Sequence, residues 1–222
     1  HERMTAWMAQ KDLLLPWLTV EENVLLGARL RGEINEDKRF RARTLIDSAG
    51  LAGYERELPA ALSGGMRQRA MIALALVSNP QLLIADEPTT ALDVTIQAQI
   101  LELVNRLRAS RDMAMIWITH DLGVVADLAD WVAVMYGGFI VEWASVDQVF
   151  ESPLHPYTLG LLACLPQIEG ERHHRLNVIP GQPPSMKAKP RGCPFAERCH
   201  YVFERCRVDN PPLMEMRNER RV

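Results

Sequence analysis

Apolar residues in the first 150 positions follow two patterns, a helical spacing and short uninterrupted runs. The helical spacing predicts five helices, at residues 20–31, 39–50, 66–77, 94–108 and 121–130. The uninterrupted runs at 82–85 and 113–119 are bounded by turn formers, which is typical of strands buried on both faces of a sheet. Two further segments, 132–136 and 139–143, flank Gly137-Gly138 and predict a β-hairpin.

The alternation of apolar strands with helices predicts an α/β fold whose parallel sheet is covered by helices on both sides. Thr19 is the expected N-cap of the first helix, and Gly50 is expected to end the second. The apolar stripes expected to face the core are Val20, Val24, Leu25 and Leu30 in the first helix and Ile96, Ile100, Leu103 and Leu107 in the fourth.

Proline positions divide the chain into two parts. Ten of the 14 prolines lie from Pro153 onward, so we expect a compact domain over residues 1–150 and a looser C-terminal extension over residues 151–222. Three of the four cysteines lie in the last thirty residues, which argues against a disulfide scaffold. The fourth, Cys164, lies in an apolar stretch and is expected to be a buried core residue.

Composition and charge narrow the function classes. The 222 residues are 48% hydrophobic and 24% charged, as in ordinary globular proteins. A net charge of −3 and a pI near 6.1 give no electrostatic reason for a nucleic-acid partner, so none is expected. The longest apolar runs are shorter than the roughly 20 residues of a membrane span. Because the chain begins at His1 without a signal peptide, we expect a cytosolic protein that is truncated at its N-terminus.

Acidic and histidine side chains follow the two predicted buried strands. Ligands of parallel α/β sheets bind beyond the carboxyl ends of the strands. Asp86 and Glu87 follow the first strand, where one carboxylate can hold Mg²⁺ while the next polarises an attacking water. His120 follows the second, where its imidazole can hydrogen-bond a terminal phosphate. Taken singly, an Asp-Glu pair indicates no more than a solvated acidic loop, and an isolated His indicates a helix-capping loop.

A Ser-Gly-Gly turn precedes the third predicted helix. Ser63, Gly64 and Gly65 would expose backbone N–H groups at a helix N-terminus, where the helix dipole favours a phosphate. Gln10, close to the start of the chain, carries an amide that can reach a metal ion or a water. By itself such a turn is usually only a helix entry, and a single glutamine is not diagnostic.

The order of these features over residues 7–143 resembles the ATP-binding cassette (ABC) ATPases. The resemblance implies a P-loop NTPase-like ABC nucleotide-binding domain, a parallel sheet flanked by helices with a helical signature subdomain, which binds ATP and Mg²⁺. It assigns one role to each site residue: Gln10 is the Q-loop glutamine, Ser63, Gly64 and Gly65 belong to the signature motif, Asp86 is the Walker B aspartate that holds Mg²⁺, Glu87 is the catalytic base, Asp93 is the D-loop residue and His120 is the switch histidine.

One part of the family pattern is absent from the sequence. None of the 13 glycines is followed by Lys, so there is no G-x-x-x-x-G-K-[ST] phosphate loop. The family carries that loop upstream of the Q-loop, which again leads us to expect N-terminal truncation. On this interpretation the full-length protein hydrolyses ATP, whereas the present chain alone is inactive. The alternative is a non-catalytic cassette.

The resemblance also implies partners and a location. In the family two cassettes, identical or paralogous, meet head to tail, and each ATP lies between one subunit's phosphate loop and the other's signature helix. The cassettes act on two transmembrane permease subunits and, through these, on a substrate-binding protein. We therefore expect a peripheral protein at the cytoplasmic face of the inner membrane, with residues 10–60 as the surface that couples to the permeases.

The tail from Pro153 resembles the C-terminal extension of oligopeptide and dipeptide ABC ATPase subunits. Residues 152–158, 179–184 and 192–206 carry the match. In those relatives four cysteines can hold a 4Fe–4S cluster. Cys193, Cys199 and Cys206 match three of them, and the fourth would be expected just past Val222. Three thiolates are one fewer than the usual set for a cubane cluster or a structural zinc, so the presence of a cluster stays open.

The first sixty residues resemble a different subfamily. The stretch 8–24 is similar to the ATPases of taurine, nitrate and thiamine-precursor importers, and the two resemblances meet near residues 62–70. We therefore expect the ATP-hydrolysing subunit of an importer of oligopeptides or dipeptides, with the taurine, nitrate or thiamine-precursor type as the alternative. ABC proteins of DNA repair or the ribosome would need coiled-coil insertions or a second cassette, and neither fits in this chain.

Overall fold

The computed structural model describes residues 5–90, 92–111, 113–165, 177–185, 190–216 and 219–222. The chain divides into two compact units, His1–Leu128 and Ala129–Val222. This division follows packing within the chain. The assignment of residues 1–150 to an ATPase domain and of residues 151–222 to an extension therefore stays a prediction.

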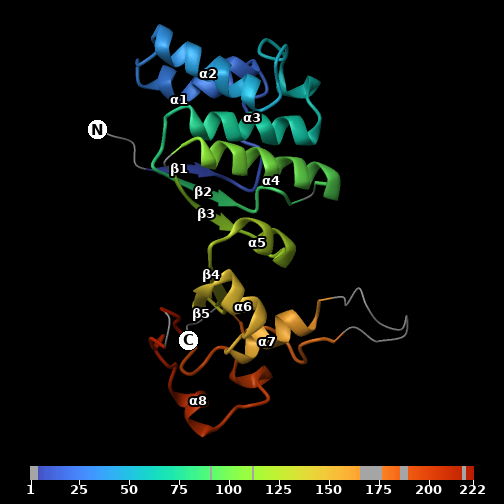
Figure 1. Ribbon diagram of the computed structural model, residues 1–222, viewed down its shortest axis with the longest axis vertical. Helices are drawn as coiled ribbons and strands as arrows, with labels where there is room; N and C mark the ends of the chain where they lie inside the picture. The colour runs from blue at the N-terminus through green and yellow to red at the C-terminus, as the bar shows by residue number, and fades with distance from the viewer. Residues whose placement is uncertain (1–4, 91, 112, 166–176, 186–189, 217–218) are drawn as a thin grey trace. The chain divides into compact units, whose positions relative to one another are not determined.

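The first unit contains a three-stranded parallel sheet (Figure 1). Its strands lie in the order β1 (Thr5–Met8), β2 (Leu82–Asp86) and β3 (Ala114–Ile118), and both neighbouring pairs are parallel. The parallel pairing of the strands at 82–86 and 114–118 confirms the α/β prediction. Strand β1 is an element that the apolar pattern did not predict.

The helices of the first unit are α1 (Val20–Leu30), α2 (Glu36–Ser48), α3 (Gly64–Leu76), α4 (Val94–Ala109) and α5 (Leu122–Leu128), with a 3-10 turn at Pro59–Ala61. All five helices match predicted ones. Thr19 caps α1 as predicted, in a capping box with Glu22. Helix α2 begins earlier than predicted because the Asn35 side chain accepts the Lys38 N–H and fixes the start of the helix.

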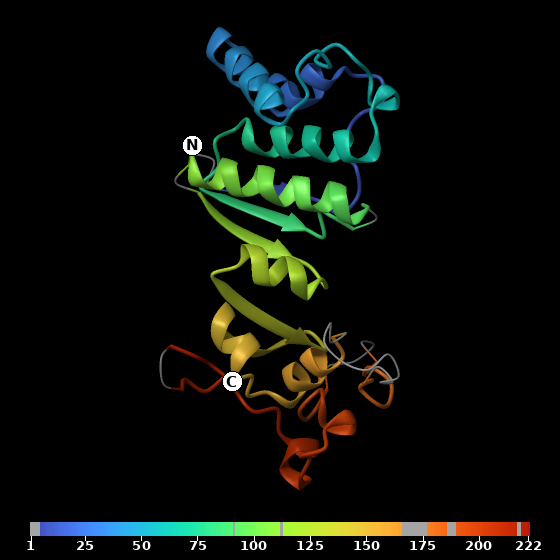
Figure 2. The ribbon, with the colours of Figure 1, turned by 45° about the vertical axis from the view of Figure 1, so that its right-hand side comes forward.

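Helices α3 and α4 run side by side along the sheet (Figure 2). They cover the sheet face that carries Met8, Leu83 and Ala85, all at most 1% exposed. The opposite face is not buried, since Ile116 is 49% exposed and Ile118 is 43% exposed. The prediction of strands buried on both faces was therefore wrong. Described helices of this unit cover one face, and β3 is at the edge of the sheet.

One further core prediction fails in the first unit. Leu30 is 78% exposed because it is the last residue of α1, and Ala28 takes its place against the core. The predicted stripe of α4 is buried at Ile100, Leu103 and Leu107, while Ile96 is partly buried.

The second unit is built on the predicted hairpin. Strands β4 (Trp131–Tyr136) and β5 (Phe139–Ser145) are antiparallel, and Gly137 and Gly138 turn the chain with φ of 56° and 82°. Because both turn residues have positive φ, a glycine pair suits this position. The helices that follow are α6 (Val146–Glu151), α7 (Pro156–Ala163) and α8 (Glu204–Val208), with a 3-10 turn at Ala196–Arg198.

The described part of the tail packs on this hairpin, and the extension over residues 151–222 stays a prediction. Phe195 lies edge-on to Tyr136 with ring centroids 5.2 Å apart. Arg198 donates to the carbonyl oxygens of Ile179 and Pro180 and to the Tyr136 hydroxyl. Backbone hydrogen bonds of 2.8 Å in both directions join Trp143 to Arg221. Aromatic and polar contacts of the tail with β4 and β5 thus offset the entropy of its proline-rich loops.

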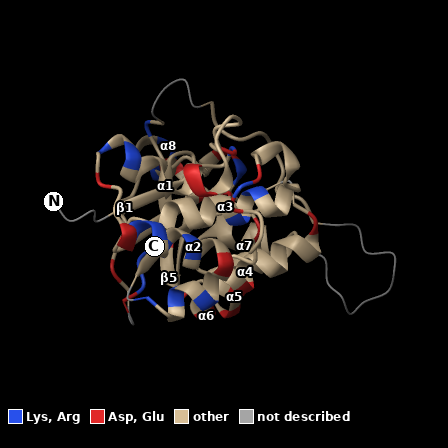
Figure 3. Cartoon of the chain, turned by 90° about the horizontal axis from the view of Figure 1, so that it is seen from above, with Lys and Arg blue, Asp and Glu red and all other residues tan. Residues whose placement is uncertain are grey.

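Cys164 lies at the C-terminus of α7 and is partly exposed, which differs from the predicted core position. Basic and acidic residues are interspersed along the helices rather than separated by sign (Figure 3). No helix within the described ranges has the length and apolar character required to cross a membrane.

Candidate active site

Side chains from two other segments converge on the Glu87 carboxylate at the carboxyl edge of the sheet. Gln10 follows β1, Glu87 follows β2 and His120 follows β3. The Gln10 amide donates to Glu87 Oε2 at 2.8 Å, and His120 Nδ1 lies 3.6 Å from Glu87 Oε1. The structure therefore brings together three residues that are 33 to 110 positions apart in sequence, at the edge where the sheet was expected to bind a ligand.

The backbone of Glu87 is held in an unusual conformation. Its φ of 45° lies in the left-handed region, which costs a non-glycine residue roughly 1–2 kcal/mol. The Glu87 N–H donates to the Ile118 carbonyl oxygen of β3 at 2.9 Å, which ties this strained residue to the neighbouring strand end. Strain of this kind persists where the surrounding structure over-determines it, and it is common at active sites.

Hydrogen bonds keep the Glu87 carboxyl group ionised. The Thr90 hydroxyl donates to Glu87 Oε2 at 2.9 Å and is the main cause that holds the pKa of Glu87 below its ordinary value. His120 and Gln10 lower this pKa further, and together with Thr90 they outweigh the opposing effect of burial. At neutral pH the group is thus a carboxylate that can accept a hydrogen bond from a water.

Asp86 is the last residue of β2 and is half-buried beside Glu87. Its carboxylate and the amide oxygen of Gln10 are hard oxygen donors. Mg²⁺ in phosphate-handling sites usually takes one or two such protein ligands and completes its shell with water and phosphate. The donor set at this edge therefore fits Mg²⁺.

The Ser-Gly-Gly turn forms the N-terminus of α3, as predicted. Ser63 Oγ accepts the Met66 N–H at 3.3 Å, while Ser63 and Gly64 are exposed. Gly65 is buried, and an added Cβ would lie 2.6 Å from Cγ2 of Ile96. A 13-residue helix thus directs its positive end at an open surface suited to a phosphate.

Side chains of α3 contact the segment that follows Glu87 and the segment that follows Gln10. The Gln68 amide donates to the Pro88 carbonyl oxygen, next to Glu87. Arg67 Nε lies 3.3 Å from Asp12 Oδ2, just after Gln10. The predicted phosphate-binding helix end and the Glu87 carboxylate are therefore connected through side chains, although the structure does not place them in one contact group.

Asp93 acts as a helix cap, whereas His120 stands on a loop with its ring exposed. Asp93 caps α4, since its Oδ1 accepts the Ile96 N–H at 2.9 Å. The side chain of His120 is 75% exposed, and its neighbour Asp121 accepts from the Gln97 amide at 2.8 Å, which lowers the pKa of Asp121. His120 thus stands on a loop fixed through Asp121 while its own ring stays open to a ligand.

Thr90 and Gln97 are site residues that sequence reasoning missed. Thr90 lies just after the predicted Asp86-Glu87 pair and Gln97 lies in the predicted helix 94–108, and neither was a candidate from the sequence. A hydroxyl residue three positions after Glu87, within a turn, was the available signal for Thr90.

The three tail cysteines lie close together in the backbone of the second unit but do not converge as ligands. The Cys193 N–H donates to the Cys206 carbonyl oxygen at 2.8 Å, and Cys199 Sγ accepts the Tyr201 N–H at 3.3 Å. Burial raises the pKa of the Cys193 thiol. Among the described residues no three His, Cys, Asp or Glu side chains are arranged to hold a metal ion. The predicted cysteine set therefore does not fit a metal centre as it stands.

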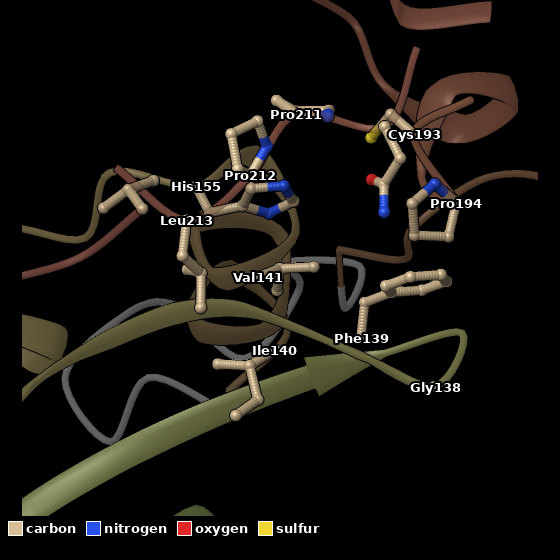
Figure 4. Close-up of a pocket in the computed structure, with 12 residues that line it drawn as sticks. Gly138, Phe139, Ile140, Val141, His155, Cys193, Pro194, Pro211, Pro212 and Leu213 are labelled. Carbon is tan, nitrogen blue, oxygen red and sulfur yellow. The ribbon is translucent and has the colours of Figure 1, made fainter. Parts of the chain in front are cut away.

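A pocket of about 430 Å³ lies beside Cys193 in the same unit (Figure 4). Its walls are largely apolar and include Ile140, Val141 and Leu213. Burial lowers the pKa of His155 in the pocket wall, and its Nδ1 accepts the Tyr157 N–H at 3.1 Å. The imidazole is therefore neutral at pH 7 and caps α7 rather than acting as a charged group.

Comparisons with known proteins give independent information. Residues 1–90 match the family model described as ABC transporter, and residues 141–206 match the model described as oligopeptide/dipeptide transporter, C-terminal region. The oligopeptide transport ATP-binding protein OppD of Bacillus subtilis is 50% identical over 184 residues, 82% of this chain and 51% of that protein. OppD of Haemophilus influenzae is 43% identical over 199 residues, 88% of this chain and 61% of that protein.

A third relative extends the similarity to the front of the chain. It is a Brucella abortus protein whose name refers to peptide import and ATP binding, 43% identical over 220 residues. That alignment covers 97% of this chain and 66% of the relative. The chain thus spans about half to two thirds of the length of the curated relatives it matches. This alignment does not test the similarity of residues 8–24 to another subfamily, which stays a prediction.

Proposed function

The chain belongs to the ATP-binding cassette (ABC) transporter family and carries the C-terminal region of its oligopeptide/dipeptide transporters, and from this premise we propose that the full protein is the ATP-hydrolysing subunit of a peptide importer. The convergence of Gln10, Glu87 and His120 at the carboxyl edge of the sheet is the observation that carries the hydrolytic part of this proposal. The tail and the names of the relatives support peptide as the substrate class.

Each site residue at the carboxyl edge of the sheet has one task in this proposal. The Glu87 carboxylate accepts a hydrogen bond from the attacking water and orients it. His120, exposed and 3.6 Å from Glu87, donates to the terminal phosphate of ATP. Asp86 and Gln10 would hold Mg²⁺, which neutralises charge on the phosphate oxygens when bound. The catalytic work is thus positioning and electrostatic stabilisation.

The signature residues would act on a second cassette. Ser63, Gly64 and Gly65 present backbone N–H groups at the positive end of α3, and we assign them to the phosphates of an ATP held by a partner ATPase subunit. Asp93 at the start of α4 belongs to the same interface. The partners proposed beyond this subunit are two transmembrane permeases and, indirectly, a substrate-binding protein. The proposed location is the cytoplasmic face of the inner membrane, where the subunit is bound peripherally.

We do not assign ATP hydrolysis to the 222 residues alone. Because no glycine in them is followed by Lys, we propose that ATP hydrolysis requires residues of the full-length protein beyond these. We propose no iron–sulfur cluster in the mechanism, since Cys193, Cys199 and Cys206 do not form a ligand group in the described structure. Iron content and visible absorbance of the full-length protein test this point.

Transport by the complete importer in proteoliposomes tests the proposal. We expect ATP-dependent uptake of a labelled dipeptide or oligopeptide, and no uptake when the cassette carries Glu87→Gln. Glu102→Gln, the same chemical change at an exposed position of α4, is a matched control that should keep uptake. Import of taurine, nitrate or a thiamine precursor in place of peptide would contradict the peptide assignment and favour the function indicated by residues 8–24.

A further inference from the structure

We propose that Thr90 is a positioning residue for hydrolysis, which anchors Oε2 of Glu87 so that Oε1 is the oxygen that orients the attacking water. The inference rests on the proposed function and deepens it. It starts from the turn that follows β2, because this turn brings a hydroxyl group back onto the carboxylate from three residues along the chain.

The backbone of the turn fixes where Thr90 lies. Glu87 has a φ of 45°, and its N–H is bound by the Ile118 carbonyl oxygen. The chain then reverses, and the Thr90 N–H donates to the Glu87 carbonyl oxygen at 3.1 Å. The Gln68 amide holds the Pro88 carbonyl oxygen from the side of α3. Contacts from β3 and α3 thus determine a turn that places the side chains of residues 87 and 90 on the same side.

The side-chain contacts distinguish the two carboxylate oxygens of Glu87. The Thr90 hydroxyl and the Gln10 amide both donate to Oε2, at 2.9 and 2.8 Å. Oε1 instead faces His120 Nδ1 at 3.6 Å, a distance longer than a hydrogen bond. With Oε2 engaged by two donors, rotation of the carboxylate is restricted, and Oε1 is presented toward the residue proposed to contact the terminal phosphate.

Thr90 is suited to this task because it adds a donor without adding a charge. A lysine or arginine at the same position would neutralise the carboxylate that must accept the water's proton. The hydroxyl hydrogen bond fixes one oxygen and leaves the negative charge on the group. Hydrolysis depends on such alignment, since a misplacement of about 1 Å can cost about 100-fold in rate.

Three variants of the full-length importer test the inference through steady-state ATP hydrolysis. Thr90→Val keeps the shape of the side chain and removes the hydroxyl, and we expect kcat to fall about tenfold with KM for ATP unchanged. Thr90→Ser keeps the hydroxyl and should hydrolyse ATP at close to the wild-type rate. Thr95→Val makes the same chemical change at an exposed position of α4 and should leave both constants unchanged.

The outcomes separate this inference from the proposed function. Wild-type kcat in Thr90→Val, or an equal loss in Thr90→Ser, would overturn the role of the hydroxyl. A rise in KM with kcat unchanged would also overturn it, because the residue would then contribute to binding rather than to positioning. Glu87→Gln measured in the same preparations tests the function itself: if that variant keeps hydrolysing ATP, the proposed function fails whatever the Thr90 variants do.

Discussion

Replacement of Arg220 by Met is expected to destabilise the second unit strongly. Glu142, in β5, is fully buried, and Arg220 donates to its Oε1 from 78 residues further along the chain. The same carboxylate accepts the backbone N–H groups of Leu154 and His155 at 2.9 and 3.0 Å. One buried carboxylate therefore joins the hairpin, the start of α7 and the C-terminal segment.

The size of the destabilisation follows from the buried Glu142 charge that Arg220→Met leaves without its partner. Removal of one partner of a buried ion pair costs about 3–5 kcal/mol because the other charge stays buried. Two backbone N–H donors remain on Glu142, so we expect the lower end of that range, about 3 kcal/mol. Methionine fills a similar length of space, which keeps the cavity contribution small.

Hydrogen exchange of the full-length protein, read by mass spectrometry, measures this effect unit by unit. Amides of Trp143 and Arg221, which pair with each other, should exchange roughly 100-fold faster in Arg220→Met, and amides of the first unit should not change. Arg221→Met is the matched control, because this neighbouring side chain is exposed and should cost less than about 0.5 kcal/mol. Equal exchange in Arg220→Met and wild type, or an equal effect of Arg221→Met, would refute the reasoning.

Three further predictions concern stability. Gly65→Ala should cost about 1–3 kcal/mol in thermal denaturation because the new Cβ would lie 2.6 Å from Ile96, whereas Gly64→Ala, 3.9 Å from its nearest neighbour, should cost far less; equal costs would contradict the packing described. Burial would raise the pKa of Glu142, yet the hydrogen bonds that the carboxylate accepts outweigh burial and hold this pKa below the ordinary 4.5. The contribution of Glu142 to the free energy of unfolding is therefore complete above pH 4.5. It is lost as pH falls through the lower folded-state pKa. A pH titration of hydrogen exchange in the second unit should show this loss in the wild type and not in Glu142→Gln. Asn35→Ala removes the cap of α2 and should cost about 1 kcal/mol, and a change in melting temperature no larger than that of an exposed Ser48→Ala would contradict this.

Helix positions were largely predictable because capping and apolar spacing are local. Thr19 and Ser63 cap the helices that their sequences indicate. Exposure was less predictable. An apolar run such as 113–118 indicates a strand, but the covering of each face depends on other layers of the fold, and β3 is open on one face. Strand β1, four residues long, has no apolar run long enough to distinguish it.

Some site residues were likewise predictable from the sequence, and others were not. Gln10, Glu87 and His120 were predicted from the order of motifs along the chain, and the structure places them together. The contact of Thr90 with Glu87 depends on a turn with positive φ, which the identity of the residues alone does not specify. The Glu142–Arg220 pair joins residues far apart in sequence, so no local pattern could indicate it.

Steady-state ATP hydrolysis by the purified full-length importer, wild type against Glu87→Gln, tests the central claim most directly. Binding of a fluorescent ATP analogue is measured on the same samples, so that loss of catalysis is separated from loss of binding. Our account predicts that Glu87→Gln binds nucleotide as the wild type does and hydrolyses it at least about 100-fold more slowly, because the carboxylate that orients the water is gone. Appreciable turnover by Glu87→Gln would contradict the assignment of Glu87 and the mechanism built on it.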